Sequence, residues 1–245
     1  MNKDELIKLG SMTAKNGFKN EQDICERFHH WQNDEVAQNW LVIMGYELSQ
    51  IRSVKAVVLH GYKADINVQV FVFYKESVDI RNIQVKLVSN KKGFNQIDKR
   101  WVKNYQELWQ FDDRICELLQ YFTGELKQGN KNRLFIFDFD EAEQALLLNW
   151  FKDNKILVLS DILRGRGEFS AEWVLVAQKL PQNARWILKN INEVLQHYGN
   201  GEVIISPRGS LKIGRVTMQR KGGDNGRVTA NMLQFKIDPT ELFGL

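Results

Sequence analysis

A carboxylate, an amide and a lysine stand in two segments whose patterns predict neighbouring strands. Asp65 begins the first segment, and one residue separates Gln84 from Lys86 in the second. Side chains two residues apart on a strand share a face, so Gln84 and Lys86 would point the same way. Oxygens of Asp65, Gln84 and the Val85 carbonyl suit a hard cation such as Mg²⁺. Lys86 could position or help deprotonate water, or stabilise phosphate charge. The set predicts metal-dependent phosphodiester hydrolysis.

This motif is weak by itself, because an aspartate followed at free spacing by Gln-x-Lys is common. A strand with a half-solvated polar face is the alternative interpretation. The surrounding pattern favours a site. Apolar residues alternate with other residues over residues 65–74 and again over residues 80–88, which predicts two strands. The short, mostly polar connection at residues 75–79 predicts an antiparallel hairpin, which brings Asp65 beside Gln84 and Lys86.

The remaining pattern mixes helices and strands. Helices are predicted at residues 20–31, 35–45, 97–122 and 141–151, and short buried strands at 134–137, 156–159 and 173–177. Residues 186–198 predict a strand or helix and then a helix ended by Gly199, and the last 45 residues predict strand pieces broken by Gly and Pro. With no internal repeat or clear linker, residues 1–245 predict one α/β domain.

Composition excludes several classes of protein. Hydrophobic residues make up 43% and charged residues 26% of the chain, which is ordinary for a soluble globular protein. We expect no signal peptide and no membrane span, because the first ten residues are polar and no run of about 18 apolar residues occurs. Cys25 and Cys116 are expected to be reduced and packed as small hydrophobic residues, in a cytoplasmic protein.

A net charge of +4 argues only weakly for nucleic acid, but the cations cluster. The first cluster follows Lys86 and opposes a single acid, Asp98; its members are Lys91, Lys92, Lys99, Arg100 and Lys103. Phe94 lies in the same segment and is either a wedge inserted between base pairs or a core residue. Gln96, Lys99 and Arg100 either reach base edges and phosphates or form a solvated helix face. Clustered cations are typical of a phosphate-binding surface.

The second cluster spans residues 208–227, where the only acid is Asp224. Its cations are Arg208, Lys212, Arg215, Arg220, Lys221 and Arg227. Arginine can bind guanine with two hydrogen bonds, and the glycines between these residues let a backbone approach phosphates. A charged turn between two strands is the alternative. The crowding favours DNA.

The other candidate motifs are incomplete. The sequence Arg164-Gly165-Arg166-Gly167 begins like a phosphate-binding loop, but it completes neither a Walker pattern nor GxGxxG. Its arginines could still contact backbone phosphate. The four histidines have no metal-ligand spacing with one another or with the cysteines, and no nucleophile-elbow motif is present.

At these residues the sequence resembles a known family. The segments YKADINV at residues 62–68, NIQVKLVSNKKGFNQ at 82–96, TMQRKGGD at 217–224 and LQFK at 233–236 carry the resemblance. They look like the type II restriction endonucleases that recognise GCGC and cut after its first G. The resemblance runs over most of the chain, and those enzymes share the Gln in place of the usual Glu. The usual motif has Pro-Asp where this chain has Ala64-Asp65, and the aspartate is kept.

The resemblance implies a PD-(D/E)XK core, with a mixed central sheet flanked by helices. It implies Mg²⁺ dependence, products with 5′-phosphates, Asp65 and Gln84 as metal ligands, Lys86 as catalytic and Phe94 as a residue that enters the DNA. In this nuclease fold a helix before the hairpin can offer an extra carboxylate. Glu21 is therefore either such an acid or a solvated acid favoured by the helix dipole.

The implied partners are double-stranded DNA and a companion methyltransferase that protects the host site without being a bound subunit. A palindromic target favours a homodimer, although a monomer cutting one strand at a time is the alternative. Two other functions stay open. One is a structure-selective or repair nuclease of the same fold, and the other is a non-catalytic DNA-binding protein.

Overall fold

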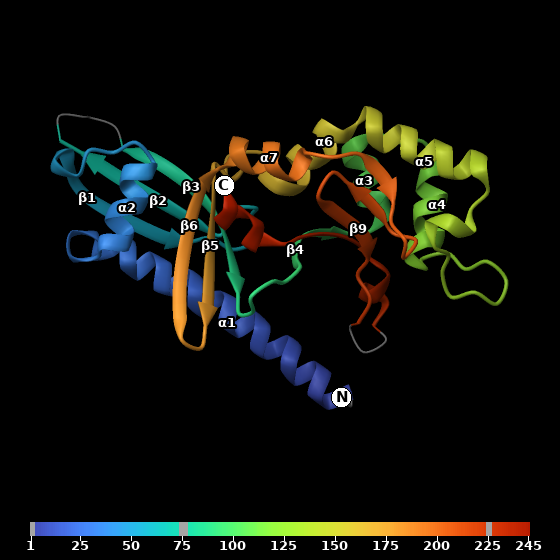
Figure 1. The fold of residues 1–245 in the computed structure, drawn as a ribbon, viewed down its shortest axis with the longest axis horizontal. Helices are drawn as coiled ribbons and strands as arrows, with labels where there is room; N and C mark the ends of the chain where they lie inside the picture. Colours follow the sequence, from blue (N-terminus) through green and yellow to red (C-terminus); the bar gives the residue numbers. More distant parts are fainter. Residues whose placement is uncertain (1–2, 74–77, 224–226) are drawn as a thin grey trace. The chain divides into compact units, whose positions relative to one another are not determined.

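Two sets of elements, each with its own five-stranded sheet, make up the described chain (Figure 1). The computed structural model describes residues 3–73, 78–223 and 227–245. One compact unit, here the β3 unit, comprises Lys8–Gly93, Arg164–Val194 and Asp238–Leu245. The other, the β9 unit, comprises Met1–Ile7, Phe94–Leu163 and Leu195–Ile237. The chain therefore passes from one unit to the other several times, and the single domain expected from the sequence stays a prediction.

The sheet of the β3 unit is mixed. Its order is β1 (Ile51–Val58), β2 (Ile66–Val72), β3 (Asp79–Val88), β5 (Trp173–Leu180) and β6 (Asn183–Asn190). Strands β3 and β5 run parallel, and the other neighbours are antiparallel. The predicted hairpin is confirmed as β2 and β3, with Ile66 opposite Ile83, although residues 74–77 of its connection lie outside the described residues. The sequence did not predict β1.

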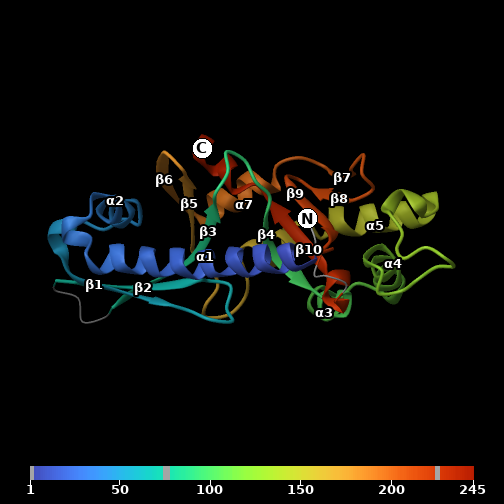
Figure 2. The same cartoon turned by 90° about the horizontal axis from the view of Figure 1, so that it is seen from below.

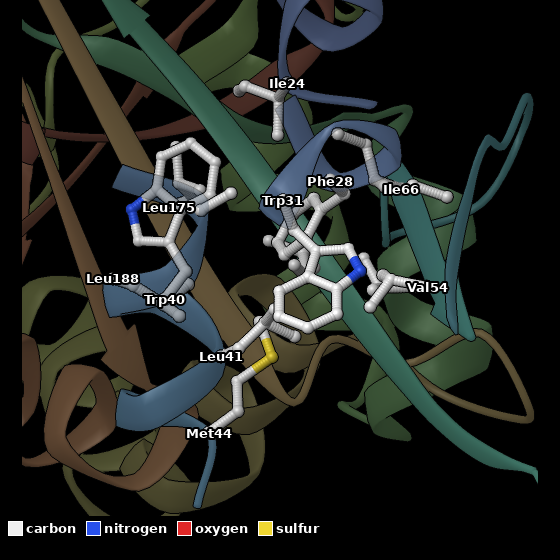
Figure 3. Close-up of a cluster of buried hydrophobic side chains, with 14 of the residues drawn as sticks. Ile24, Phe28, Trp31, Trp40, Leu41, Met44, Val54, Ile66, Leu175 and Leu188 are labelled. Carbon is white, nitrogen blue, oxygen red and sulfur yellow. The ribbon is translucent and has the colours of Figure 1, made fainter. Parts of the chain in front are cut away.

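Two helices cover one face of this sheet. They are α1 (Lys3–His29) and α2 (Glu35–Ile43), separated by a 3₁₀ turn (Trp31–Asn33), and a second 3₁₀ turn (Leu48–Gln50) precedes β1. The side chain of Asp34 accepts hydrogen bonds from the first amides of α2 and so begins that helix. Figures 2 and 3 show α1 and α2 against the strands, with Phe28, Trp40 and Ile66 among the buried apolar side chains. Burial of this cluster orders the sheet that carries Asp65 and Gln84.

Helix α1 is much longer than predicted. It begins at Lys3, whereas the sequence predicted a helix only over residues 20–31. Gly10 and Gly17 lie inside this helix, although glycine disfavours a helix interior by about 1 kcal/mol. No proline occurs between residues 3 and 29, so nothing interrupts the backbone hydrogen bonds.

The sheet of the β9 unit is antiparallel throughout. Its order is β4 (Asn95–Arg100), β10 (Leu233–Ile237), β9 (Val216–Arg220), β8 (Leu211–Ile213) and β7 (Val203–Ile205). Its helices are α3 (Val102–Trp109), α4 (Asp113–Thr123), α5 (Glu141–Asp153) and α6 (Lys155–Leu159). Helix α7 (Ile191–Gly199) begins in the β3 unit and ends in this one. The predicted helix at 141–151, the strand at 173–177, the strand-then-helix at 186–198 and the C-terminal strand pieces are confirmed.

The long helix predicted over residues 97–122 is wrong. Residues 95–100 form β4, which pairs with β10 and has an irregularity opposite Phe235 and Lys236. The rest divides into α3 and α4, because Gln110 adopts a left-handed backbone conformation with φ of 57° and Asp112 caps α4. Pairing with a strand 133 to 142 residues further along the chain overrode the helical periodicity, and a local pattern cannot reveal such a partner.

The short strands predicted at residues 134–137 and 156–159 are also wrong. The first segment enters a 3₁₀ turn (Ile136–Asp138), and the second is helix α6. Val158 and Leu159 are buried while Ile156 is 85% exposed, so the apolar run covers more than one face of a helix. A short apolar run does not by itself distinguish a strand from a helix.

Two further expectations concern the membrane and the cysteines. Among the described residues, no helix has both the length and the apolar character that crossing a bilayer requires. Cys25 and Cys116 are buried free thiols, as predicted.

Phe28 is the clearest test of the core of the β3 unit. Its ring is fully buried and lies 5.2 Å from that of Trp40, centroid to centroid. Phe28→Ala removes this packing and leaves a cavity, so we expect the free energy of unfolding to fall by about 3–5 kcal/mol. Phe18 of the same helix is 54% exposed, and Phe18→Ala is the matched control, with an expected change within about 0.5 kcal/mol. Urea unfolding measures both; equal effects would contradict the assignment of the core.

Candidate active site

The carboxylate of Asp65 is fixed at the open end of the hairpin. Its backbone amide donates to the carbonyl of Ile83 over 2.9 Å, which extends the pairing of β2 and β3 by one residue. Its Oδ2 atom accepts a hydrogen bond of 2.6 Å from the amide of Val85. The second bond ties the carboxylate to the residue between Gln84 and Lys86. The predicted juxtaposition of Asp65 with the Gln-Val-Lys segment is therefore present in the structure.

Gln84 is buried on the face of β3 opposite the apolar cluster. Its side chain is enclosed, and the residue is only 3% exposed. Its Nε2 atom donates to the carbonyl of Lys63 over 3.4 Å. An amide whose nitrogen is held in this way presents its oxygen on the other side of the group. That orientation suits an oxygen ligand.

The backbone of Val85 offers a further oxygen. The N–H and C=O of one residue in a strand point toward the same side. The Val85 amide bonds to Asp65, so its carbonyl lies on the Asp65 side of β3. The register of β2 with β3 stops at Ile83, which leaves that side without a β2 partner at Val85.

Glu21 of α1 is electrostatically coupled to this group. Burial raises the pKa of the Glu21 carboxyl to about 7, the Asp65 carboxylate adds to the rise, and Lys86 opposes it. A carboxyl group that senses both charges lies close to the site. Glu21 is half-buried, and it lies eighteen residues after the first residue of α1. It is therefore not a solvated acid at the start of a helix.

These oxygens fit a hard divalent cation. Among the described residues, no group of three or more His, Cys, Asp or Glu side chains could hold a metal ion. The set here is of another kind: the carboxylate of Asp65, the amide oxygen of Gln84 and the carbonyl of Val85, with Glu21 nearby. Oxygen ligands of mixed charge are what Mg²⁺ and Ca²⁺ accept.

The sequence did not point to the side chains that support the site. Asn82 shares the face of Gln84; its side-chain amide donates to the Glu168 carbonyl over 2.8 Å, and its oxygen accepts from Asn67 over 3.0 Å. Its backbone amide donates to the carboxylate of Glu172 over 3.1 Å. The period-two run Asn82, Gln84, Lys86 was the available signal, since three polar residues share one strand face.

Lys91 and Lys92 are exposed in the loop that follows β3. The buried side chain of Gln178 donates to the carbonyls of Asn90 and Lys91 over 2.7 and 3.2 Å, and its oxygen accepts from Arg185. A fixed backbone thus presents two solvated ammonium groups directly after the strand that carries Lys86.

Phe94 is not a core residue. It is 64% exposed, so the interpretation of Phe94 as an anchor of a helix is wrong. An exposed phenylalanine between lysines and a polar strand keeps the wedge interpretation as a prediction.

Strand β4 carries the next group of candidates in the β9 unit. Gln96 and Lys99 are exposed on this strand, so they do not form the solvated helix face that was the alternative. Arg100 is engaged internally: it pairs with Asp98 at 3.0 Å and with Asp161 at 2.7 Å. The hydroxyl of Tyr105 also donates to Asp98 over 2.7 Å. This partly buried network holds β4 to its helices, and it occupies the Arg100 guanidinium.

The C-terminal candidates lie on and between the strands β7 to β9. Arg208 and Arg215 are exposed in turns, whereas Arg220 and Lys221 are half-buried at the end of β9. Arg220 donates through Nε and Nη2 to the side chain of Asn231, over 3.2 and 2.6 Å. Asp224, the acid of this cluster, lies outside the described residues.

The fold, with a mixed central sheet flanked by helices, is shared with a restriction endonuclease. The structure is similar to that of the restriction endonuclease MspI, which was solved in complex with its cognate DNA, with a TM-score of 0.64. The two share 14% sequence identity, and the similarity covers 89% of this chain and 87% of MspI. No curated protein gave a match.

The particular family follows from the sequence itself. The model of the R.HinP1I restriction endonuclease family matches residues 44–243, and the chain belongs to that family. The protein is thus a restriction endonuclease, a hydrolase that cleaves DNA. The matched range includes Asp65, Gln84 and Lys86, whereas Glu21 lies before it.

The raised pKa of Glu21 predicts a pH dependence of stability. In the unfolded chain this carboxyl has its ordinary pKa of 4.5, and in the folded chain about 7. The folded state therefore binds more protons between these values, and stability falls as pH rises through the interval. Glu21→Gln removes the titration, so wild-type protein should lose stability relative to this variant between about pH 4.5 and 7.

Urea unfolding of the wild type and Glu21→Gln at several pH values measures this difference. Glu35→Gln, at an exposed glutamate that begins α2, is the matched control and should follow the wild type. A constant difference between wild type and Glu21→Gln across the interval would contradict the raised pKa.

Proposed function

We propose that this protein is a Mg²⁺-dependent type II endonuclease that cuts double-stranded DNA at GCGC, after the first G, and leaves 5′-phosphates. The hydrogen bond from the Val85 amide to Asp65 is the observation that carries the catalytic part, because it sets the carboxylate beside Gln84 and Lys86. The sequence resemblance of residues 62–68, 82–96, 217–224 and 233–236 supports the target and the products. Membership of the R.HinP1I family supports the class of reaction.

Asp65, Gln84 and Val85 are the proposed ligands of the cation, with Glu21 as an additional acid. A bound divalent cation lowers the pKa of a water molecule and stabilises charge on the phosphate. Asp65 supplies the fixed negative charge. The amide of Gln84 is held by Lys63 and so needs little reordering when its oxygen takes part.

Lys86 is proposed to orient the attacking water and to stabilise the charge that develops on the scissile phosphate. An ammonium group is a compact donor of three hydrogen bonds, which suits either role. Glu21 has a pKa near neutrality and senses Lys86, so it is proposed to exchange a proton with water close to that lysine.

The proposed DNA contacts are the exposed members of the candidate sets, taken unit by unit. In the β3 unit these are Lys91 and Lys92. In the β9 unit they are Phe94, Gln96, Lys99, Arg208 and Arg215, with Arg220 and Lys221 as partly buried members. We leave Arg100 out, because two carboxylates already hold its guanidinium. We propose that Arg100 orders β4 instead, and so places Gln96 and Lys99.

Double-stranded DNA is the proposed substrate, in the cytoplasm, with a companion methyltransferase protecting the host sites. A palindromic target suits a homodimer, and a monomer that cuts each strand in turn is the other arrangement. Light scattering of Asp65→Ala protein with a GCGC duplex distinguishes them.

Digestion of a plasmid of known sequence tests the proposal. With Mg²⁺, wild-type protein should give ends that map to GCGC, and chelation of the metal should abolish cleavage. Asp65→Ala should bind the same DNA but cut at least roughly 10³-fold more slowly. Asp65→Asn is the matched variant, since it keeps an acceptor for the Val85 amide and removes the charge; it should be equally impaired.

Three outcomes would overturn parts of this proposal. Ends scattered over many sequences would identify a structure-selective or repair nuclease. Binding without cleavage by the wild type would identify a non-catalytic DNA-binding protein. Full activity of Asp65→Asn would show that the carboxylate charge has no part in catalysis.

Phe94 provides a test of the wedge. If its ring enters the duplex, Phe94→Ala should reduce DNA bending and weaken binding by about 1–3 kcal/mol, the usual order of the stacking energy between an aromatic ring and a base. Affinity for Ca²⁺ without DNA should not change. Phe73 at the far end of the hairpin is 48% exposed, and Phe73→Ala is the control. Unchanged bending in a fluorescence assay would exclude the wedge.

A further inference from the structure

The loop of residues 164–171 lies against the chain segment that leads into Asp65. The Ala64 amide donates to the carbonyl of Phe169 over 3.1 Å, and the rings of Tyr62 and Phe169 lie 4.3 Å apart, centroid to centroid. The loop is closed on itself by a 2.7 Å bond from the Ala171 amide to the carbonyl of Arg164. The loop and this segment belong to the β3 unit.

Gly165 makes the approach close enough to reach Lys63. A Cβ at Gly165 would lie 2.5 Å from the Cβ of Lys63, and the backbone here has a φ of +79°, so only glycine fits without displacing its neighbour. The carbonyl of Lys63 in turn accepts the hydrogen bond from Gln84. Contacts thus run without a break from the loop to a proposed metal ligand.

The loop is also attached to the strand that carries Gln84 and Lys86. The side chain of Asn82 donates to the carbonyl of Glu168 over 2.8 Å, and the backbone amide of Asn82 donates to Glu172 over 3.1 Å. Attachments to β3 and to the segment before β2 fix the loop's backbone relative to the proposed active centre.

This fixed loop exposes two arginines. Arg164 and Arg166 are both exposed, one on each side of the glycine that packs on Lys63. Glu168 is the exposed acid of the same loop. The two guanidinium groups and the ammonium group of Lys63 together carry more positive charge than Glu168 carries negative charge. The scissile phosphate must reach Asp65, so the closest part of the substrate to this loop is the sugar-phosphate backbone of DNA.

We propose that the loop of residues 164–171 binds backbone phosphates next to the scissile phosphate, with Arg164 and Arg166 as the contacting side chains. The inference rests on the proposed function, because it takes the centre at Asp65 as the place of cleavage. Guanidinium groups form paired hydrogen bonds to phosphate. Phosphate contacts fix the position of DNA but read no sequence, so the loop sets the distance of the strand from Asp65 and not the target.

Salt dependence tests this inference. The logarithm of the binding constant falls as the logarithm of salt concentration rises, and each lost phosphate contact reduces the magnitude of that slope by about 0.9. We expect Arg164→Ala and Arg166→Ala each to lower the slope by about that amount and to weaken binding equally for a GCGC duplex and an unrelated duplex. Binding is measured with Ca²⁺ in place of Mg²⁺, and circular dichroism checks the fold of each variant.

Arg52→Ala is the matched control. Arg52 is an exposed arginine on β1 and lies opposite the far end of β2. At the usual rise per strand residue, that end of β2 is about 20 Å from Asp65. Its removal should leave the slope unchanged. Gly165→Ala is a second variant: it strains the loop between the two arginines and displaces Lys63, so it should reduce the magnitude of the salt slope and also slow cleavage at saturating DNA.

An unchanged slope in both arginine variants would overturn the inference. A loss of affinity confined to the GCGC duplex would also overturn the inference, since such a loss would indicate base recognition. Failure of the wild type to cut GCGC would refute the proposed function instead, and the slopes measured on the unrelated duplex would still report on the phosphate contacts.

Discussion

The proposed active centre depends on one hydrogen bond, from the Val85 amide to the carboxylate of Asp65. Strand pairing alone brings β2 and β3 together only as far as Ile66 and Ile83. Beyond that point the side chain of Asp65 takes the place of a strand partner. It accepts a hydrogen bond from the amide of Val85, the next amide of β3 on the β2 side. A charge-assisted bond of this kind is stronger than one between neutral groups. It orients the carboxylate by the same backbone that orients Gln84 and Lys86.

The charge at this centre is low for a site that attracts a cation. Gln84 is neutral where the PD-(D/E)XK pattern has a carboxylate, and the Glu21 carboxyl has a pKa raised to about 7, so it is only partly ionised at neutral pH. Affinity of oxygen sites for divalent cations rises with the number of charged ligands. In the proposed function, therefore, Asp65 and the phosphate of the substrate supply most of the negative charge. Binding of DNA and binding of the cation then reinforce each other.

The sequence was sufficient where the pattern was local. Alternation predicted β2 and β3, and their register brought Asp65 to Gln84 and Lys86 as expected. It was insufficient where a distant partner decided the structure. Residues 95–100 form a strand because β10 pairs with them. A second kind of failure is the apolar run at residues 156–159, which is too short to distinguish a strand from the helix that it forms. The supporting contacts of Asn82 and Lys63 come from a loop about 80 to 100 residues away in the sequence, which no spacing rule could reveal.

The parallel pairing of β3 with β5 has a consequence during protein synthesis. Residues 84–88 of β3 pair with β5 alone, which spans Trp173–Leu180. A ribosome that has finished β3 must therefore add about 90 more residues, which takes on the order of 10 s at usual rates of synthesis, before those residues have a partner. Until then the strand that carries Gln84 and Lys86 is an unpaired edge. A growing chain thus completes the proposed active centre late, when most of the polypeptide has already been made.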